Sequence, residues 1–188
     1  MIYFVRHGAT DWNDNLDENG KKAPRCQGRV DIPLNQNGIK QAEETAKQLV
    51  GKKFARVICS PLIRARQTCD IIYKGKTPVE IDERVIERDF GEFEGLTREQ
   101  FDFLGFWNKK NFDRKYKKAE SIKDVQDRLF SLLDELKKED GDVLIVSHGG
   151  LGCVFLSYFK QMPEDGNYIS FELPHGKPLV VDFNEKTK

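Results

Sequence analysis

Short apolar runs alternate with amphipathic stretches along this chain of 188 residues. Four of the runs are rich in β-branched and aliphatic residues and predict buried strands. They cover residues 2–6, 56–60, 79–81 and 143–147. In the amphipathic stretches, apolar residues recur at helical spacing and predict helices. These stretches cover residues 37–50, 61–73, 121–139 and 151–159.

The alternation of strands and helices predicts an α/β fold, a three-layer α/β/α sandwich with a mainly parallel central sheet. Residues 169–173 and 179–183 alternate well enough to predict two late strands, with an antiparallel arrangement as one option. No repeat and no convincing linker divides the chain, so residues 1–188 are expected to form a single domain.

Polar residues mark two of the helix starts. Ser60 followed by Pro61 is a usual cap and first-turn pair, which places the start of a helix directly after the second strand. Thr97 with Gln100 resembles a capping box, so part of the segment that follows is expected to be helical.

Two segments break the regular pattern. Residues 14–26 form a polar insert dominated by loop-forming residues. At about residues 97–119 the chain is aromatic and charged, and a short helical cap is expected there. The cap is more typical of aromatic packing on a core than of a platform for stacked bases. Both segments are expected to rim a site near the strand ends.

Composition narrows the class of protein. Lys+Arg and Asp+Glu both number 31, and the absence of a basic excess argues against a nucleic-acid partner. The N-terminal apolar run is short and is followed at once by Arg6, which predicts neither a signal peptide nor a membrane partner.

The four cysteines, Cys26, Cys59, Cys69 and Cys153, form no C-x-x-C pair and match no zinc spacing. Cys59 and Cys153 lie in apolar stretches and are expected to be reduced core thiols, whereas Cys26 lies in a polar loop and is expected to be exposed. A cytoplasmic location follows as the default.

Two of the predicted strands end in His-Gly. Arg6-His7-Gly8 follows the first strand, and His148-Gly149 follows the strand at 143–147. If these strands are neighbours, both imidazoles lie at the carboxyl edge of the sheet, where open α/β sheets place their chemistry. Two imidazoles with an arginine suit attack on a phosphoryl group by a nitrogen nucleophile.

Such a site needs cations around the phosphoryl oxygens and an acid for the leaving oxygen. Arg64 lies one turn into the helix that follows residues 56–60, where its planar guanidinium could take two phosphate oxygens. Carboxylates are available in the segment from Glu87 to Gly95.

Five motifs occur in the order found in a known family, the histidine phosphatase superfamily. They cover residues 6–13, 27–42, 60–68, 87–95 and 146–150. The chain therefore resembles the branch that includes cofactor-dependent phosphoglycerate mutases and small broad-specificity phosphatases. The likeness extends over most of the chain.

The resemblance implies a role for each motif residue. His7 would be the nucleophile that becomes phosphohistidine, and Glu87 would be the proton donor. The phosphoryl group would be bound by a further set, which consists of Arg6, Arg64, His148, Asn13, the backbone of Gly149, Gln27 and Gly28. With two arginines and a cationic second histidine, no metal or other cofactor is expected.

Alternatives stay open for three residues. Asp89 remains a second candidate for the proton donor, because Glu87 is preferred on motif position only. Arg66 is expected to be solvated or ion-paired. His175 matches no motif and is expected to be a loop histidine.

The cap departs from the mutase pattern, because it lacks the lysine and paired arginines that hold a phosphoglycerate carboxylate. The leading prediction is a metal-independent phosphomonoesterase that acts on a small phosphorylated metabolite. Its polar or anionic body would lie near Lys109, Lys110, Arg114 and Lys115, with a ring against Phe106 or Trp107. A phosphoglycerate mutase, a non-catalytic phospho-ligand module and a histidine–metal hydrolase are the alternatives, and the oligomeric state is not predicted.

Overall fold

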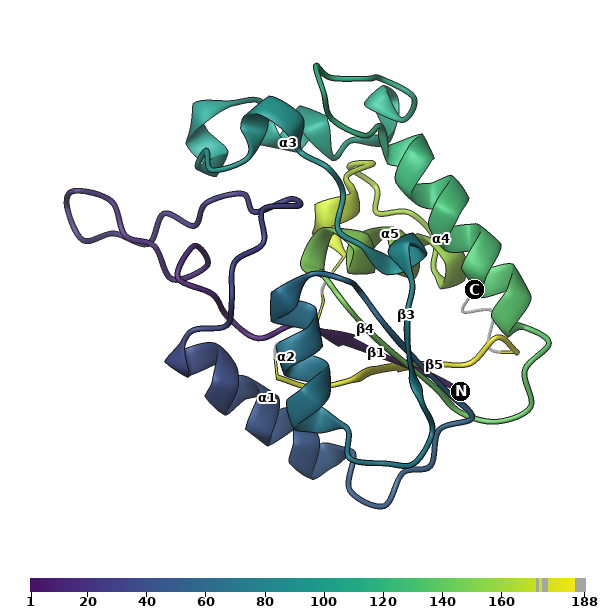
Figure 1. Ribbon diagram of the computed structural model, residues 1–188. Coiled ribbons are helices and arrows are strands. Elements are labelled where there is room, and N and C mark those ends of the chain that lie inside the picture. Colours follow the sequence, from purple (N-terminus) through teal and green to yellow (C-terminus); the bar gives the residue numbers. More distant parts are fainter. Residues whose placement is uncertain (172, 174–175, 185–188) are drawn as a thin grey trace.

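A five-stranded sheet forms the centre of the computed structural model, which describes residues 1–171, 173 and 176–184. The strands are β1 (Ile2–Arg6), β2 (Arg56–Cys59), β3 (Val79–Ile81), β4 (Val143–Ser147) and β5 (Leu179–Val181). Their order is β3-β2-β4-β1-β5 (Figure 1). Neighbours from β3 to β1 run parallel, and β5 pairs antiparallel with β1. The two strands that end in His-Gly are therefore direct neighbours, as the site requires.

Helices cover both faces of the sheet. They are α1 (Gln36–Gln48), α2 (Ile63–Ile72), α4 (Ile122–Leu136) and α5 (Gly149–Phe159). Alternate strand residues face opposite ways. Val5 and Val57 pack with α1 and α2 on one face, while Phe4 and Ile58 pack with α4 and α5 on the other. The predicted three-layer α/β/α sandwich is confirmed.

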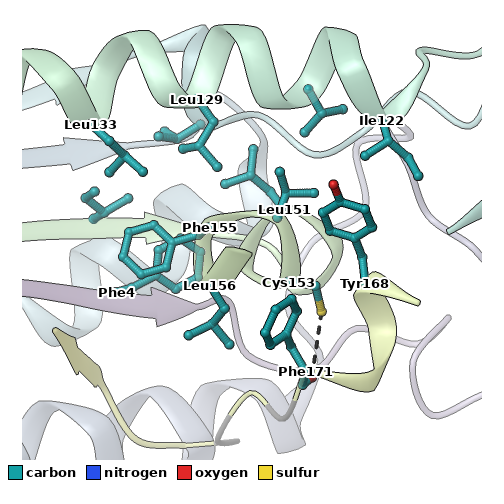
Figure 2. Close-up of a cluster of buried hydrophobic side chains, with 14 of the residues drawn as sticks. Phe4, Ile122, Leu129, Leu133, Leu151, Cys153, Phe155, Leu156, Tyr168 and Phe171 are labelled. Carbon is teal, nitrogen blue, oxygen red and sulfur yellow. Dashed lines mark hydrogen bonds between the residues drawn. The ribbon is translucent and has the colours of Figure 1, made fainter. Parts of the chain in front are cut away.

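The larger core lies between the sheet and helices α4 and α5. In Figure 2, Leu129 and Leu133 of α4 face Phe155 of α5, whose ring stacks on Phe4 with centroids 4.7 Å apart. A fully buried side chain of this kind contributes about 1.5–3 kcal/mol. This packing fixes α5, and with it the segment that carries His148.

The cap consists of short helical pieces. Thr97 and Gln100 form the expected capping box, which opens a 3₁₀ turn at Arg98–Gln100, and α3 covers Phe103–Phe106. Aromatic rings pack together beneath these pieces, with Phe93 stacked on Phe101 at 4.6 Å between centroids. The expectation that the aromatic residues pack on the core is confirmed, since Phe106 and Trp107 are buried.

Several boundaries differ from the predictions. Helix α2 starts at Ile63, not Pro61, and its cap residue Leu62 makes no side-chain capping bond. The start of α1 is capped by Asn35, whose side chain accepts from the backbone N–H of Gly38 at 2.9 Å. Helix α5 starts at Gly149, two residues earlier than predicted, and α4 ends at Leu136.

The strand expected at 169–173 is wrong for the residues that the structure describes there. Tyr168–Ser170 is a 3₁₀ turn, and residue 172 lies outside the described part. The antiparallel strand β5 pairs instead with β1. Cys26 is 7% exposed, so its expected exposure is also wrong. His175 lies outside the described residues.

None of the helices in the described part of the chain is long and apolar enough to cross a bilayer. Within the same residues, no group of three or more His, Cys, Asp or Glu side chains is arranged to hold a metal ion.

Candidate active site

A cavity of about 270 Å³ opens where β1 and β4 end. Its innermost polar lining, which we call the cavity floor, consists of Arg6, His7, Arg64 and Glu87. Its mouth, which we call the rim, is formed by residues 24–26 of the insert and by Arg98, Phe103 and Trp107 of the cap. The sheet thus supplies the floor, and the two irregular segments supply the rim.

His7 is held in one orientation directly after β1. Its backbone N–H donates to the carbonyl of Ser147 at 2.9 Å, and its ring Nδ1 lies 2.7 Å from the carbonyl oxygen of Gly8. A carbonyl can only accept, so Nδ1 carries a proton. The Nε–H of Arg64 donates to Nε2 at 3.2 Å, which requires a lone pair on Nε2. His7 is therefore neutral here, and the lone pair of its Nε2 accepts from Arg64.

Gly8 permits the chain to turn at this point. A Cβ on Gly8 would lie 2.3 Å from the carbonyl oxygen of Gly38, a distance that no side chain tolerates. The glycine therefore lets the start of α1 approach the residue whose carbonyl orients His7.

Arg64 is fully buried in the first turn of α2. Its Nη1 donates to the carbonyl of Val30 at 2.8 Å and its Nη2 to the carbonyl of Gly28 at 2.7 Å. Burial lowers its pKa to about 10, so the guanidinium stays charged at neutral pH. Three of its five N–H groups are used by the protein, and two remain for a ligand. Arg66, by contrast, is exposed and does not line the cavity, as expected.

His148 lies beside His7, with the ring centroids 5.1 Å apart, at the N-terminus of α5. Its Nε2 is 2.7 Å from the hydroxyl oxygen of Ser60, and its Nδ1 has no hydrogen-bond partner in the described chain. Burial, with help from the charge of Arg64, lowers the pKa of His148 well below its ordinary value. His148 is therefore neutral in this site, not cationic as the sequence suggested.

Ser60 does not cap α2 as predicted, because its hydroxyl is hydrogen-bonded to Nε2 of His148. The same oxygen also accepts, at 3.4 Å, from the backbone N–H of Leu62. That donor uses one lone pair of the oxygen and leaves its second lone pair and its proton for Nε2, so this contact accommodates either neutral tautomer of His148.

Glu87 reaches the cavity from the loop after β3. Its carboxylate accepts from the backbone N–H groups of Gly150 and Leu151, both at 2.9 Å. These donors belong to the first turn of α5, where a helix favours a negative charge. Asp89 does not line the cavity; its carboxylate accepts from Gly91 and lies 4.0 Å from Arg29. The geometry therefore favours Glu87 as the carboxylate of the site.

Arg6 and Gly149 face each other across the floor. A Cβ on Gly149 would lie 3.0 Å from Cζ of Arg6, so the guanidinium lies close against the backbone that opens α5. Burial lowers the pKa of Arg6, and the negative charge of Glu87 opposes that effect. A cation and a helix N-terminus thus share one small space, which is typical of an anion site.

Asn13 and Gln27 line the cavity, and their side chains are held by Thr10, a residue that the sequence analysis did not single out. The backbone N–H of Thr10 donates to Oδ1 of Asn13 at 3.1 Å. Its hydroxyl, which has one proton, donates to Oε1 of Gln27 at 3.0 Å. With both amide oxygens engaged, each NH₂ group is left to donate to a ligand. The sequence did contain a signal for this residue, because Thr10 lies inside the first motif at residues 6–13.

The rest of the cavity lining differs from the lining that the sequence predicted. Trp107 lines the cavity as predicted, but Phe106 does not, because Arg88 covers its ring with Cζ 3.4 Å from the centroid. None of the four expected cap residues, Lys109, Lys110, Arg114 and Lys115, lines the cavity. Its rim carries Arg25 and Arg98 instead.

Arg88 is a buried cation that the sequence analysis did not single out. Its Nε donates to the carbonyl of Glu120 at 2.9 Å, and burial lowers its pKa to about 9. Arg88 follows Glu87 directly in the chain and stacks on Phe106 and Trp107 of the cap. It therefore links the cap to the segment that carries Glu87.

Two thiols, Cys26 and Cys153, also line the cavity. Burial raises the pKa of each to about 12, so both stay protonated at neutral pH. A protonated thiol is a poor nucleophile, which leaves His7 as the nucleophile that this geometry favours.

Similarity to known proteins establishes the family of this chain. The model of the histidine phosphatase superfamily (branch 1) matches residues 2–188, and the chain belongs to that superfamily. The uncharacterized phosphatase PhoE of Bacillus subtilis (strain 168) is 36% identical over 152 residues, which cover 79% of this chain and 71% of PhoE. The probable phosphoglycerate mutase GpmB of Serratia proteamaculans (strain 568) is 33% identical over 163 residues, 82% of this chain and 72% of GpmB.

Among solved structures, the mycobacterial glucosyl-3-phosphoglycerate phosphatase superposes with a TM-score of 0.70 at 26% identity. The match covers 90% of this chain and 82% of that one. The relatives thus include both phosphatases and mutases, and they support an enzyme of phosphoryl chemistry.

Proposed function

We propose that this protein is a metal-independent phosphomonoesterase that hydrolyses a small phosphorylated metabolite through a phosphohistidine on His7. The observation that carries the proposal is the state of His7. Its Nδ1 is committed to the carbonyl of Gly8, and the lone pair of Nε2 points to Arg64 within the lining of the cavity. A neutral imidazole fixed in this way can attack phosphorus once a bound phosphoryl group takes over the N–H of Arg64 and releases the lone pair of Nε2.

In the first step, Nε2 of His7 forms a bond to phosphorus while the bond to the ester oxygen breaks. Glu87, which takes up a proton as the phosphoryl dianion approaches its carboxylate, gives that proton to the departing oxygen, which leaves as an alcohol. Arg6, Arg64 and the N–H of Gly149 hold the non-bridging oxygens, supported by Nδ1 of His148 and the amides of Asn13 and Gln27. Gly28 contributes by holding Arg64 through its carbonyl. Two guanidiniums supply the positive charge that Mg²⁺ supplies in other phosphoryl-transfer sites.

In the second step, water attacks the phosphorus and the phosphorus–nitrogen bond breaks. Glu87 gave up its proton in the first step, so as a carboxylate it now accepts the proton of the attacking water. Orthophosphate leaves, and His7 returns to its neutral form.

Incubation with a ³²P-labelled alkyl phosphate tests this proposal. We expect an acid-labile label on the wild-type protein, release of orthophosphate, and no loss of turnover with a chelator. Failure to form a labile phosphoprotein during turnover would contradict the mechanism.

The mutase alternative draws on the relatives named as mutases, such as GpmB. It predicts interconversion of 2- and 3-phosphoglycerate without release of phosphate. The cap favours hydrolysis, because none of its lysines at positions 109, 110 and 115 lines the cavity. A non-catalytic phospho-ligand module would bind phosphate esters without any release of orthophosphate.

A further inference from the structure

Arg128 of α4 does not line the cavity, but it holds the main chain of the segment that carries Glu87. Its Nη2 donates to the carbonyl of Glu87 at 3.2 Å, and its Nη1 donates to the carbonyl of Arg84 at 2.9 Å. A weaker contact of 3.5 Å joins Nη1 to the carbonyl of Glu83. One guanidinium thus holds both ends of residues 83–87, the segment between β3 and the proposed proton donor.

Glu120 sets the orientation of this guanidinium. The two carboxylate oxygens of Glu120 accept from Nε and Nη2 of Arg128, both at 3.1 Å. The side chains of Arg128 and Glu120 are 16% and 18% exposed, so water screens this ion pair only in part. The carboxylate and the three carbonyls together use all five N–H groups of Arg128. A lysine ammonium, with three donors at one point, cannot make the same set of bonds.

The carboxylate of Glu87 is held separately, by the backbone N–H groups of Gly150 and Leu151 at the start of α5. The segment before it contains only the short 3₁₀ turn Glu83–Val85, so its main chain depends strongly on side-chain contacts. A glutamate side chain has three rotatable bonds. The distance from its carboxylate to a bound phosphate ester is therefore fixed only when its main chain is fixed as well. A misplacement of about 1 Å in a catalytic group can cost about 10²-fold in rate.

We propose that Arg128 is a positioning residue for proton transfer, because it fixes the main chain of Glu87 so that the carboxylate meets the departing ester oxygen. The inference rests on the proposed phosphatase function and adds a residue to it. Arg128 touches neither the substrate nor the reacting atoms and acts only through Glu87. Its loss should weaken protonation of the leaving group and spare the grip of Arg6 and Arg64 on the phosphoryl oxygens.

Arg128→Lys tests the proposal with two substrates that differ in their need for a proton. For an alkyl phosphate, kcat/KM should fall by about 10–10²-fold, the scale for a displaced catalytic group. For nitrophenyl phosphate, whose leaving group needs no proton, kcat/KM should stay within a few-fold. In a Glu87→Gln background, Arg128→Lys should cause no further loss with the alkyl phosphate, since residues that act through one another are not additive.

Arg56→Lys is the matched control. Arg56 is also a partly buried arginine, with a side chain 18% exposed, and it pairs with the carboxylates of Glu80, Glu135 and Glu139. It lies in the first position of β2, at the end of the strand away from the cavity. Its substitution removes a comparable ion pair without releasing Glu87, so the ratio of the two kcat/KM values should stay that of the wild type.

Glu120→Gln gives a second route if Arg128→Lys does not fold. It leaves Arg128 in the chain and removes the charge that orients its guanidinium, so the loss should be smaller but confined to the alkyl phosphate. Arg29→Gln controls for the other ion pair of Glu120, in which Nη2 of Arg29 lies 3.0 Å from the carboxylate. It should show no dependence on the leaving group.

Equal losses with both substrates in Arg128→Lys or Glu120→Gln, no loss with either substrate, or a further loss in the Glu87→Gln background would overturn the inference while the wild type still hydrolysed both esters. If the wild type released orthophosphate from neither substrate, the proposed function would fail and the inference with it.

Discussion

The cavity floor and the rim are built in different ways. Arg6 and His7 of the floor lie at the end of β1, Arg64 lies in the first turn of the helix after β2, and Glu87 lies in the loop after β3. The side chains of His7, Arg64 and Glu87 are fixed by backbone groups. The rim comes from the insert and the cap, whose segments are irregular and bridge to each other at Arg25 and Thr97. The proposed chemistry thus depends on residues held by regular elements and backbone hydrogen bonds, whereas the opening of the cavity depends on two irregular connections.

The floor and the rim also differ in how deeply their arginines are buried. Arg64 of the floor is 0% exposed and makes hydrogen bonds to two carbonyls, whereas Arg25 and Arg98 of the rim are exposed. Electrostatic interactions are strong where water is excluded and are screened where it is not. Changes in the floor should therefore cost far more than changes in the rim.

The largest effect is expected for His7→Ala, which removes the nucleophile. Turnover should fall by more than about 10⁴-fold, and the acid-labile phosphoprotein should disappear. Circular dichroism and the melting temperature establish that the variant is folded. Substantial residual turnover in the pure, folded variant would break the assignment of His7.

Glu87→Gln should come next, with a loss that depends on the leaving group. Alkyl phosphates need a proton on the departing oxygen, so their kcat/KM should fall by about 10²–10⁴-fold. Nitrophenyl phosphate needs none and should lose much less. Asp89→Asn is the matched control, since Asp89 does not line the cavity. The assignment would shift to Asp89 if that variant showed the leaving-group dependence instead.

Arg64→Lys keeps the charge but loses the planar fork that donates to His7, Val30 and Gly28. We expect a loss of about 2–4 kcal/mol in transition-state stabilisation, measured as kcat/KM. Arg66→Lys, at an exposed position two residues further along α2, should change little. Equal effects of the two substitutions would show that Arg64 does not hold the phosphoryl group.

His148, which lies beside His7 of the floor, should make the free energy of unfolding depend on pH. Its pKa is lowered by burial, so below its ordinary value near 6.5 the unfolded chain binds a proton that the folded chain does not. Stability from this group is present above pH 6.5 and is lost as the pH falls, by up to about 2 kcal/mol at pH 5. Urea unfolding between pH 5 and 7 should show a steeper acid slope for the wild type than for His148→Gln. Parallel slopes would mean that His148 is charged in the folded state.

The smallest effect is expected from the insert. The backbone N–H of Ala23 donates to the carbonyl of Asn15 at 2.9 Å, so residues 16–22 can be replaced by two glycines without moving residues 24–26. Nitrophenyl phosphate turnover should stay within a few-fold, while kcat/KM for larger substrates changes unequally. A uniform loss for all substrates would show that the insert supports the floor.

The floor could be foreseen because its residues follow strands. His7, Arg64, Glu87 and His148 occur in motifs whose spacing is fixed by the strand or helix that carries them, and the structure brings them together or, for His148, directly beside His7. The choice between Glu87 and Asp89 could not be made from spacing. It depends on which carboxylate meets the N–H groups that open α5.

The rim could not be foreseen, since it depends on contacts between segments far apart in the sequence. Phe106 and Trp107 are neighbours in an aromatic stretch, and only the position of Arg88 decides that Phe106 is covered while Trp107 lines the cavity. The same reason explains Cys26, which lies in a polar loop but is buried against the core.

The amino-acid sequence by itself determined the order of the main strands and helices and which side chains are proposed to react, because periodicity and motif spacing are local properties. Only the tertiary structure decided the tautomer of His7, the neutral state of His148 and the pair of arginines at the rim. Each of these depends on a partner from another segment: the guanidinium of Arg64, the burial that desolvates an imidazole, and the bridge between insert and cap. Hydrogen-bond partners and burial are properties of the folded chain, and no window of sequence contains them.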